Sequence, residues 1–323
     1  MSSPGDKDLS RKIKDFALSI GFDLIGIAPS KQLSNHKEVI KNWLSAGMNA
    51  DMLFLSRDIE KRTNPALLAD GAKSIVVAGI NYYPSEKQGG DGMPVISKYA
   101  YGKDYHSVLG EKLNNLLEFI VSCEPVAKGK VCVDVAPILE KAWAREAGLG
   151  WIGKNSILIN KEIGSFIFLG EIVLNIDLQY DKPFSDDFCG SCTLCMKACP
   201  TDAINENRTI DARKCISWLT VENKNPIPFR YAGKMKGRVF GCDICQDICP
   251  WNKNAKPHNI PEFILSTELA KLNSEEWLSL SREKYMELFS QSSVGRIKYE
   301  KLKRNIETIF KDKRQKIKDK SKK

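Results

Sequence analysis

The segment "CGSCTLCMKACP", from Cys189 to Pro200, places four thiols within eleven residues. Its spacing, C-x2-C-x2-C-x3-C-P, is that of bacterial ferredoxins, in which three thiolates bind one 4Fe–4S cluster and the fourth binds a second cluster. The pattern therefore predicts a second set of cysteines further along the chain. The segment "GCDICQDICP", together with the isolated Cys215, supplies that set.

The eight clustered cysteines divide into two groups of four. One cluster is expected to be bound by Cys189, Cys192, Cys195 and Cys249, and the other by Cys199, Cys215, Cys242 and Cys245. A structural zinc site built from two C-x2-C pairs is the alternative. Zinc would leave four thiols unused and would not explain two C-x3-C-P endings. The remaining Cys123 and Cys132 are each expected to be buried, inert thiols.

The bulk composition limits the class of protein. With 323 residues and 42% hydrophobic content, the chain can form one large domain or two smaller ones. It has no apolar run near the ~20 residues of a membrane helix, and its N-terminus resembles neither a secretory nor a twin-arginine signal. We therefore expect a cytoplasmic protein without membrane contact. Thiols are kept reduced in that compartment, which favours metal ligation over disulfides.

The positive charge is concentrated at the C-terminus. The net charge is +9, and residues 301–323 alone carry eleven Lys/Arg and three Asp/Glu, a net +8. The final segment, "KDKRQKIKDKSKK", has two interpretations that the sequence leaves open. It is either a solvated, partly disordered end or an electrostatic contact for nucleic acid.

Hydrophobic patterning predicts an α+β fold. We expect a mixed α/β domain over residues 1–180, a bis-4Fe–4S ferredoxin-like module over 181–256, C-terminal helices over 257–310 and a basic tail over 311–323. Helices are predicted near 7–20, 105–122 and 138–148, with a polar helical stretch over 33–62 and two helices after the cysteine segment. Strands are predicted near 22–29, 73–83 and 129–137. The "KEIG" sequence between two apolar runs predicts a β-hairpin.

Two further motif matches do not predict a cofactor site, because the sequence around each differs from what the motif requires. The sequence "GLGWIG" matches G-x-G-x-x-G, but a predicted helix precedes it and a strand follows, the reverse of a dinucleotide-binding unit. The sequence "DYHSVLG" is one residue longer than the D-x-H-x-x-G cobalamin signature of mutases. His106 is therefore given little weight as a metal ligand. With only three histidines in the chain, a histidine-built metal centre is not expected.

Asp134 is the candidate acid. It interrupts the apolar run "VCVDVAP", and aspartate is disfavoured in strands. A carboxyl held among apolar groups has a raised pKa and can serve as a proton donor. The alternative is an aspartate at the end of a strand, meeting solvent or a turn. The residues alone do not decide between the two.

Several long stretches together resemble one family. They are "SKYAYGKDYHSVL", "VDVAPILEKAWAREAGLGWIGKNSILIN", "GSFIFLGEI", "CGSCTLCMKACPTDAI", "CISWLT" and "GCDICQDICPWN". In this order they resemble the epoxyqueuosine reductases, cobalamin-dependent iron–sulfur enzymes of queuosine synthesis in tRNA. The resemblance spans roughly residues 10–305. It implies that epoxyqueuosine at the wobble position of tRNA is deoxygenated to queuosine, with electrons from an unidentified donor.

The resemblance also implies roles for particular residues. Asp134 matches the proton donor of the family, and cobalamin is expected between the α/β domain and the cysteine module. The implied cobalamin contacts are Arg57, Ser97, Asp134, Leu158, Leu169, Ile172, Ser217, Cys242 and Asp243. Longer members carry C-terminal helical repeats that can help hold tRNA, whereas this chain has the lysine-rich tail. The protein is expected to act as a monomer.

Two other functions are considered. A corrinoid iron–sulfur reductive dehalogenase shares cobalamin and paired clusters, but such enzymes are usually exported with a twin-arginine signal. An iron–sulfur electron carrier would not need a 180-residue α/β domain with a candidate acid. Both are weaker hypotheses than a tRNA-modifying reductase.

Overall fold

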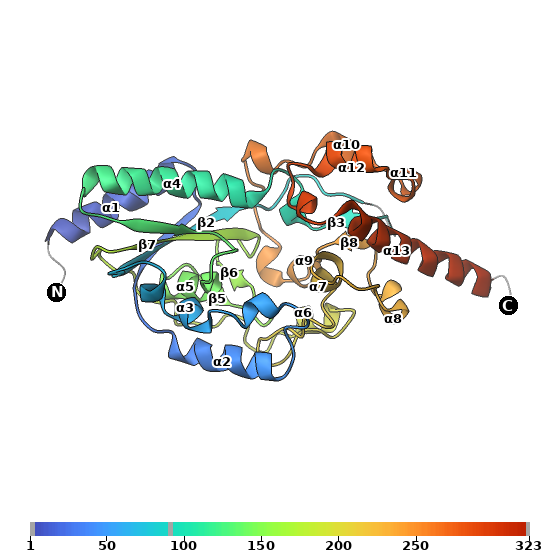
Figure 1. Ribbon diagram of the computed structural model, residues 1–323, viewed down its shortest axis with the longest axis horizontal. Helices are drawn as coiled ribbons and strands as arrows, with labels where there is room; N and C mark the ends of the chain where they lie inside the picture. The colour runs from blue at the N-terminus through green and yellow to red at the C-terminus, as the bar shows by residue number, and fades with distance from the viewer. Residues whose placement is uncertain (1–3, 90–92, 321–323) are drawn as a thin grey trace.

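The computed structural model describes residues 4–89 and 93–320, with side chains described over residues 7–89 and 93–311. A sheet-containing region and a helical region lie side by side along the long axis of the molecule (Figure 1). The cysteine-rich segment lies between them. This arrangement is the α+β organisation predicted from the sequence.

A four-stranded antiparallel sheet forms the centre of the first region, in the order β1-β2-β7-β4. Strand β2 reads "SIVVAGIN", and all of its residues are buried, as expected for a β-branched run in the middle of a sheet. The strands are β1 (Leu24–Pro29), β2 (Ser74–Asn81), β4 (Gly129–Cys132) and β7 (Ile167–Leu174).

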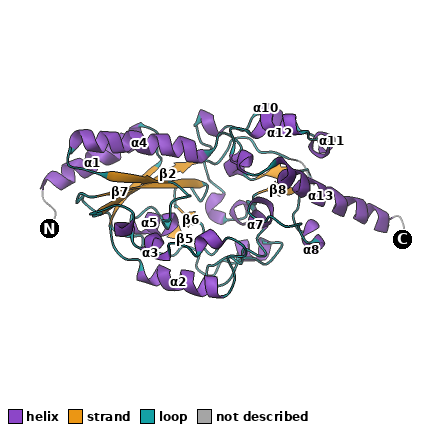
Figure 2. Cartoon of the chain, viewed as in Figure 1, coloured by secondary structure: helices purple, strands orange, loops and turns teal. Residues whose placement is uncertain are grey.

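Helices cover both faces of this sheet (Figure 2). One face packs against α1 (Pro4–Ser19) and α4 (Tyr105–Cys123), and the other against α5 (Glu140–Glu146). Gly170 on β7 allows the close approach of α4, because a Cβ there would lie 2.6 Å from Leu113 Cδ1. Between β1 and β2 the chain forms short helices. They are α2 (Ser34–Ser45), η1 (Leu53–Leu55), α3 (Ile59–Thr63) and η2 (Pro65–Leu67).

Two sequence predictions in this region are wrong. The predicted hairpin does not form a ladder, because β6 (Leu158–Ile159) pairs with β5 (Trp151–Ile152) and not with β7, and an isolated antiparallel bridge between Asn160 and Gly164 closes the loop that follows β6. The predicted strand over 129–137 ends at Cys132. Cys132 is buried as expected, whereas Cys123 at the end of α4 is exposed.

The cysteine segment contains short elements joined by turns. They are α6 (Leu194–Ala198), α7 (Ile216–Val221), α8 (Phe229–Ala232), β8 (Arg238–Phe240), α9 (Ile244–Asp247) and η4 (Pro250–Asn252). Strand β8 pairs in parallel with β3 (Val95–Ile96). Strand β3 is followed in the chain by η3 (Lys98–Ala100). The insertion over 216–241 therefore connects the cysteine segment to the loop before α4.

In the part of the chain that is described, the C-terminal region has four α-helices, where two were predicted. They are α10 (Thr267–Lys271), α11 (Ser274–Leu278), α12 (Arg282–Phe289) and α13 (Tyr299–Lys320), with η5 (Pro261–Phe263) before α10 and η6 (Ser293–Arg296) between α12 and α13. The short ones escape sequence prediction because α10 and α11 have five residues each and α12 has eight, too few for a clear periodic pattern.

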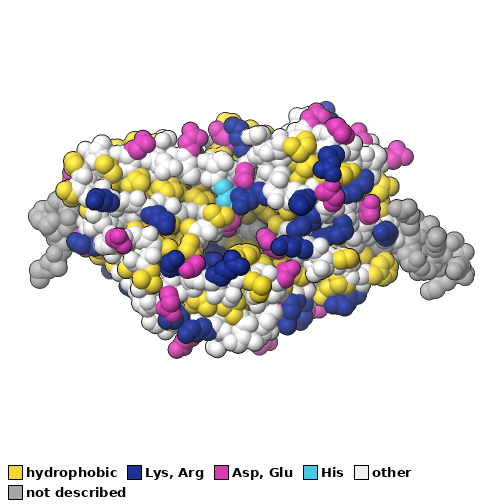
Figure 3. Space-filling model, viewed as in Figure 1, with side chains coloured by type: hydrophobic (Ala, Val, Ile, Leu, Met, Phe, Trp, Pro, Cys, Tyr) yellow, Lys and Arg dark blue, Asp and Glu magenta, His cyan; other side chains and the backbone are white. Residues whose placement is uncertain are grey.

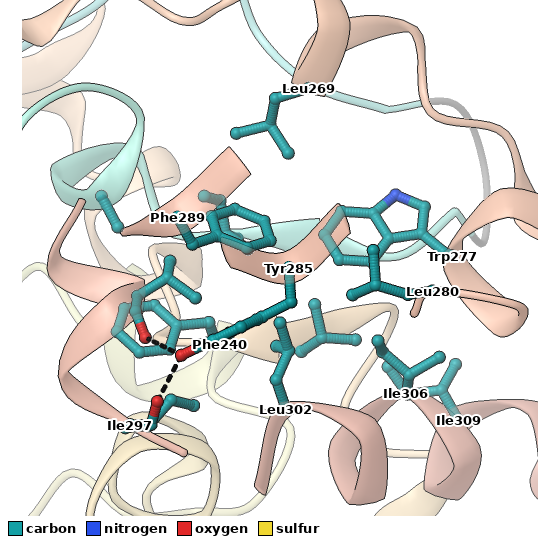
Figure 4. Close-up of a cluster of buried hydrophobic side chains, with 14 of the residues drawn as sticks. Phe240, Leu269, Trp277, Leu280, Tyr285, Phe289, Ile297, Leu302, Ile306 and Ile309 are labelled. Atoms are coloured by element: carbon teal, nitrogen blue, oxygen red, sulfur yellow. Dashed lines mark hydrogen bonds between the residues drawn. The ribbon is translucent and has the colours of Figure 1, made fainter. Parts of the chain in front are cut away.

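One core unites these helices with the insertion. Figure 4 shows Phe240 of β8 in one hydrophobic cluster with Trp277, Tyr285, Phe289 and Leu302. The Tyr285 hydroxyl hydrogen-bonds the carbonyl of Val294 at 3.2 Å and that of Ile297, so its one polar atom is satisfied inside the core. The helical region thus fixes the position of the insertion beside the cysteines.

The basic tail begins as part of a helix. Helix α13 continues through residues 311–320, so this stretch has a helical backbone and is not an unstructured end. The side chains of residues 312–323 lie outside the described residues. Among the residues described, no helix is both long and apolar enough to cross a membrane.

Candidate functional site

A cavity of about 760 Å³ opens where the sheet, the cysteine segment and the C-terminal helices meet. Its walls come from the start of α4, the turn after β4, the start of α5, the first residues of β7 and helix α7. Figure 3 shows this face of the molecule hollowed near its centre, with Lys and Arg side chains gathered around and beside the hollow. Arg296 and Lys301 belong to the cavity lining.

Two smaller cavities hold the predicted cluster cysteines in the two groups expected. One, of about 200 Å³, is lined by Cys189, Cys192, Cys195 and Cys249. The other, of about 270 Å³, is lined by Cys199, Cys215, Cys242 and Cys245. Cys249 joins the first group because α9 packs against α6 and returns the C-terminal end of the motif to its start. The crossed arrangement is therefore present in the fold.

The second cysteine cavity adjoins the large cavity, and the first does not. Several residues line both the 270 Å³ and the 760 Å³ cavities, namely Tyr99, Lys141, Ile157, Ile210, Cys215 and Ser217. The 200 Å³ cavity shares no lining residue with the large cavity among the residues described. Its wall instead includes Phe188 and Trp251, whose ring centroids lie 5.8 Å apart.

Asp134 lies in a turn just beyond the end of β4 and lines the large cavity. Its φ is 47°, a left-handed conformation that costs energy for most residues but is better tolerated by aspartate. The Val135 N–H donates to the Val133 carbonyl at 2.5 Å, which closes a three-residue γ-turn around Asp134. The sequence alternative of a strand-end aspartate in a turn is therefore correct.

His106 joins two carboxylates at the cavity wall. Its Nδ1 lies 2.6 Å from Asp104 Oδ1, and its Nε2 lies 2.8 Å from Asp134 Oδ2. With a carboxylate at each nitrogen, the imidazole is held as the doubly protonated cation that donates to both. Asp104 also caps α4 by accepting the His106 backbone N–H at 3.2 Å, so the helix start fixes this arrangement.

The electrostatics differ from the sequence prediction of a raised pKa at Asp134. Burial raises that pKa, but the hydrogen bond and positive charge of His106, with a hydrogen bond from Tyr105, outweigh it and lower the pKa. Burial lowers the pKa of His106, but its two carboxylate partners raise it to about 9. At neutral pH the proton of this pair therefore belongs to His106, and the prediction of a raised pKa at Asp134 is wrong.

A half-buried acid lies behind the Asp134 turn. Glu140, the first residue of α5, accepts the Asp134 backbone N–H through Oε1 at 2.6 Å. Burial raises the Glu140 pKa, the hydrogen bond from the Asp134 backbone opposes that rise, and the Asp134 charge adds to it, giving a pKa of about 7. Lys141 lines the cavity beside it, and burial lowers the Lys141 pKa.

The residues implied as cobalamin contacts fall into four groups. Asp134, Leu158 and Leu169 line the large cavity, Ser217 lines both it and the second cysteine cavity, and Ser97, Cys242 and Asp243 line the second cysteine cavity. The two outside these cavities are Arg57, exposed after η1, and Ile172, fully buried on the α4 face of the sheet.

Ser97 and Asp243 are held by each other. The Ser97 hydroxyl donates to Asp243 Oδ1, and the Lys98 backbone N–H donates to Asp243 Oδ2 at 2.8 Å. Lys98 Nζ lies 3.5 Å from the same carboxylate and 2.5 Å from Asp247 Oδ1. This buried network ties the start of η3 to the N-cap of α9.

The residues present fit the implied groups. Four thiols face each small cavity, which is the ligand type and number that a 4Fe–4S cluster requires. The large cavity offers about 760 Å³ with a mixed polar and apolar lining, and the adjoining cavity adds about 270 Å³ with a mostly apolar lining, so together they have room for a large cofactor.

Sequence reasoning missed His106, Glu140 and Lys141 as site residues. His106 was considered only as a metal ligand, whereas its partners are carboxylates, one of them from a different segment of the chain. Glu140 and Lys141 resemble ordinary helical charges. A charged pair at the start of a short helix directly after the candidate acid was the one available signal.

Two family models match the chain. One, described as epoxyqueuosine reductase QueG, covers residues 62–135, and the other, a 4Fe-4S double cluster binding domain, covers residues 188–252. The second match favours iron–sulfur clusters over the zinc alternative. The epoxyqueuosine reductase of Leadbetterella byssophila is 46% identical over 93% of this chain and 98% of the relative.

Solved structures of the same enzyme have the same fold. The epoxyqueuosine reductase of Bacillus subtilis, with its catalytic aspartate loop swung out of the active site, superposes with a TM-score of 0.85 at 32% identity, over 94% of this chain and 81% of that one. An epoxyqueuosine reductase bound to an epoxyqueuosine-modified tRNA-Tyr stem loop superposes with a TM-score of 0.84 at 34% identity, over 94% and 80%.

Proposed function

The chain belongs to the epoxyqueuosine reductase family, and from that membership we propose that it reduces epoxyqueuosine to queuosine in tRNA. The observation that carries the proposal is the match over 94% of the chain to a reductase bound to an epoxyqueuosine-modified tRNA stem loop. The reaction removes the epoxide oxygen as water, so it consumes two electrons and two protons. Family membership favours this reaction over the dehalogenase and electron-carrier hypotheses.

The electrons enter through the cysteine segment. Cys189, Cys192, Cys195 and Cys249 would bind the outer cluster, and Cys199, Cys215, Cys242 and Cys245 the inner one. Of the two groups, the inner one borders the large cavity, which supports an order of transfer from the outer cluster to the inner cluster to the reaction site. The donor that supplies the outer cluster is a redox partner of unidentified type.

The large cavity is proposed to hold cobalamin, which supplies a strongly reducing metal centre to the reaction when bound. Leu158 and Leu169 would form the apolar wall, and Ser217 with Cys242 the wall toward the inner cluster. Ser97 and Asp243 would act as one hydrogen-bonded unit. Ile172 lies on the α4 face of the sheet and would act only through packing. Arg57 would act only from the exposed segment after η1.

One of the two protons is proposed to come from a pair of residues, and the second from solvent. Asp134 faces the cavity and delivers the proton to the leaving oxygen, while His106 Nε2–H, 2.8 Å from Asp134 Oδ2, replenishes it. Because His106 holds the proton at neutral pH, Asp134 acts as a conduit and not as an isolated acid with a raised pKa. Asp104 and Arg296 hold His106 in place, since Arg296 lies 3.5 Å from Asp104.

The remaining assignments are also proposals. The enzyme is proposed to act in the cytoplasm as a monomer, without membrane contact, on tRNA that already carries epoxyqueuosine. The cavity opening is bordered by Arg296 and Lys301, which are suited to contact phosphates of the anticodon arm.

The test is a direct assay with anaerobically purified protein. Cobalamin and iron contents are measured first, and the protein is then given a chemical reductant and tRNA carrying epoxyqueuosine. Conversion to queuosine, followed by mass spectrometry of the digested tRNA, is the expected result. A protein that holds both clusters and a corrinoid but leaves epoxyqueuosine unchanged would contradict the proposal.

A further inference from the structure

The turn that carries Asp134 is held in a costly conformation. Asp134 has a φ of 47° at the centre of a γ-turn, closed by the 2.5 Å hydrogen bond from Val135 N–H to the Val133 carbonyl. A γ-turn with a positive central φ is rare and strained, and such geometry persists only where neighbouring groups impose it. The Asp134 side chain is also 50% exposed, so packing alone does not fix it.

Contacts to both the side chain and the backbone of Asp134 hold this turn. His106 binds the Asp134 carboxylate, and Glu140 Oε1 accepts the Asp134 backbone N–H at 2.6 Å. The Glu140 contact is a hydrogen bond to a charged group, which is shorter and stronger than one between neutral groups. Glu140 is well placed to impose the backbone geometry because it is the first residue of α5, whose Ala142, Trp143 and Ala144 are buried in the core.

We propose that Glu140 is a positioning residue, whose carboxylate latches the Asp134 turn so that the Asp134 carboxyl stays against His106 and faces the reaction site. The inference rests on the proposed function and deepens it. With the latch in place, Asp134 is aligned for proton delivery. Without it, the strained turn relaxes and the carboxyl leaves the site.

The latch depends on the charge of Glu140. The charged and titratable groups around Glu140 are Asp134, His106 and Tyr105 on the same wall of the cavity, Lys141 beside it, and Cys132 and Glu171 on the adjoining strands. Glu171 is 0% exposed, and neither of its carboxyl oxygens has a hydrogen-bond partner among the described residues. Burial raises the Glu171 pKa well above its usual value, so Glu171 is neutral and does not repel Glu140.

The Glu140 pKa of about 7 sets the direction of the pH dependence. Above this pH the carboxylate is charged and the latch is strong. Below it, the neutral acid accepts the Asp134 N–H more weakly and the turn is released more often. The fraction of enzyme molecules in which Asp134 is aligned with the site should therefore decline as the pH falls below neutrality.

The test is a comparison of Glu140→Gln with the wild-type holoenzyme. Glutamine has the same shape and keeps an acceptor oxygen, but it carries no charge. The expected results are a fall in kcat of about 10- to 100-fold with KM for tRNA unchanged within about twofold, since misplacement of a reacting group by about 1 Å can cost 100-fold. The Asp134 amide should exchange its hydrogen at least about tenfold faster than in the wild type.

The matched control is Glu146→Gln, at the other end of α5. Glu146 pairs with Lys31 and does not line the large cavity, so the same substitution there should leave kcat and amide exchange unchanged. A second variant, Glu140→Asp, keeps the charge but shortens the side chain and should also release the turn. Iron and cobalamin contents report whether each variant is folded.

Hydrogen exchange separates the latch from the activity. If wild-type enzyme fails to convert epoxyqueuosine, the proposed function is wrong, yet the Asp134 amide still reports on the latch. If Glu140→Gln retains wild-type protection of that amide at about pH 8, where the wild-type carboxylate is charged, the latch is wrong whatever the activity. The latch is supported if protection of the Asp134 amide declines at acidic pH in the wild type and shows no such decline in Glu140→Gln.

Discussion

The two walls of the large cavity are built in different ways. The wall from the cysteine segment presents Cys215 and Ser217 and lies against the inner cluster site. The opposite wall presents His106, Asp134 and Glu140 from the start of α4 and the turn before α5. Under the proposed function, one wall would supply electrons and the other protons, and they are called the electron wall and the proton wall below. A reductive deoxygenation needs both, and the fold brings them to one space from segments about 80 residues apart.

The walls also differ in how they are held. The electron wall depends on eight thiols in a local sequence pattern and on metal coordination. The proton wall depends on a few hydrogen bonds, and the central one joins the His106 and Asp134 side chains, which are 28 residues apart in the sequence. Substitutions in the first wall should therefore change the cofactor content, whereas substitutions in the second should change the rate with the cofactors intact.

The largest effect is expected from Cys215→Ala on the electron wall. Removing one thiolate should eliminate the inner cluster and leave the outer one, so the iron content should fall from about eight to about four per chain. Turnover should be lost because the inner cluster is the one that borders the reaction site. Iron analysis and electron paramagnetic resonance measure the change. Full iron content in this variant would contradict the ligand assignment.

The next largest effect is expected from Asp134→Asn on the proton wall. Asparagine keeps the shape and still accepts from His106 Nε2–H, but it cannot pass on a carboxyl proton. Turnover should fall about 100- to 10,000-fold, as is usual on loss of a general acid, with clusters and cobalamin retained. Single-turnover assays on tRNA carrying epoxyqueuosine measure this, and near-normal turnover would assign the proton to another group.

A smaller effect is expected from His106→Gln. In the wild type, His106 is protonated below its pKa of about 9, so the rate should hold at neutral pH and fall as the pH rises through about 9. In the variant this alkaline limb should disappear, and the rate at neutral pH should be about 10- to 100-fold lower. A pH–rate profile measures both features. An unchanged alkaline limb would show that His106 is not the proton reservoir.

The smallest effect is expected outside the two walls, at the C-terminus. Deleting residues 311–323 removes eight Lys/Arg and two Asp. If the tail binds tRNA phosphates, the slope of log K against log salt should become shallower by about 0.7 to 0.9 for each phosphate that is no longer neutralised. Turnover on saturating tRNA, iron and cobalamin should be unchanged. Identical slopes in the two proteins would support a solvated end without a role in RNA binding.

The sequence determined the electron wall almost completely. The spacing of Cys189, Cys192 and Cys195 and the C-x3-C-P endings predicted two groups of four, and the structure brings the same two groups together. Such patterns are readable because metal ligation constrains residue type and spacing locally. The long helices α1 and α4 and the buried strand β2 were predictable for the same reason, since their periodicity lies within one segment.

Only the tertiary structure decided the proton wall. The sequence marked Asp134 as unusual, but its position after β4, its γ-turn and its lowered pKa depend on His106, about 30 residues away, and on Glu140. A pKa is set by the charges and solvent around a group in space, and no spacing rule carries that information. The short helices α10 to α12 were missed on similar grounds, because the shared core with β8 stabilises them and their own periodicity does not.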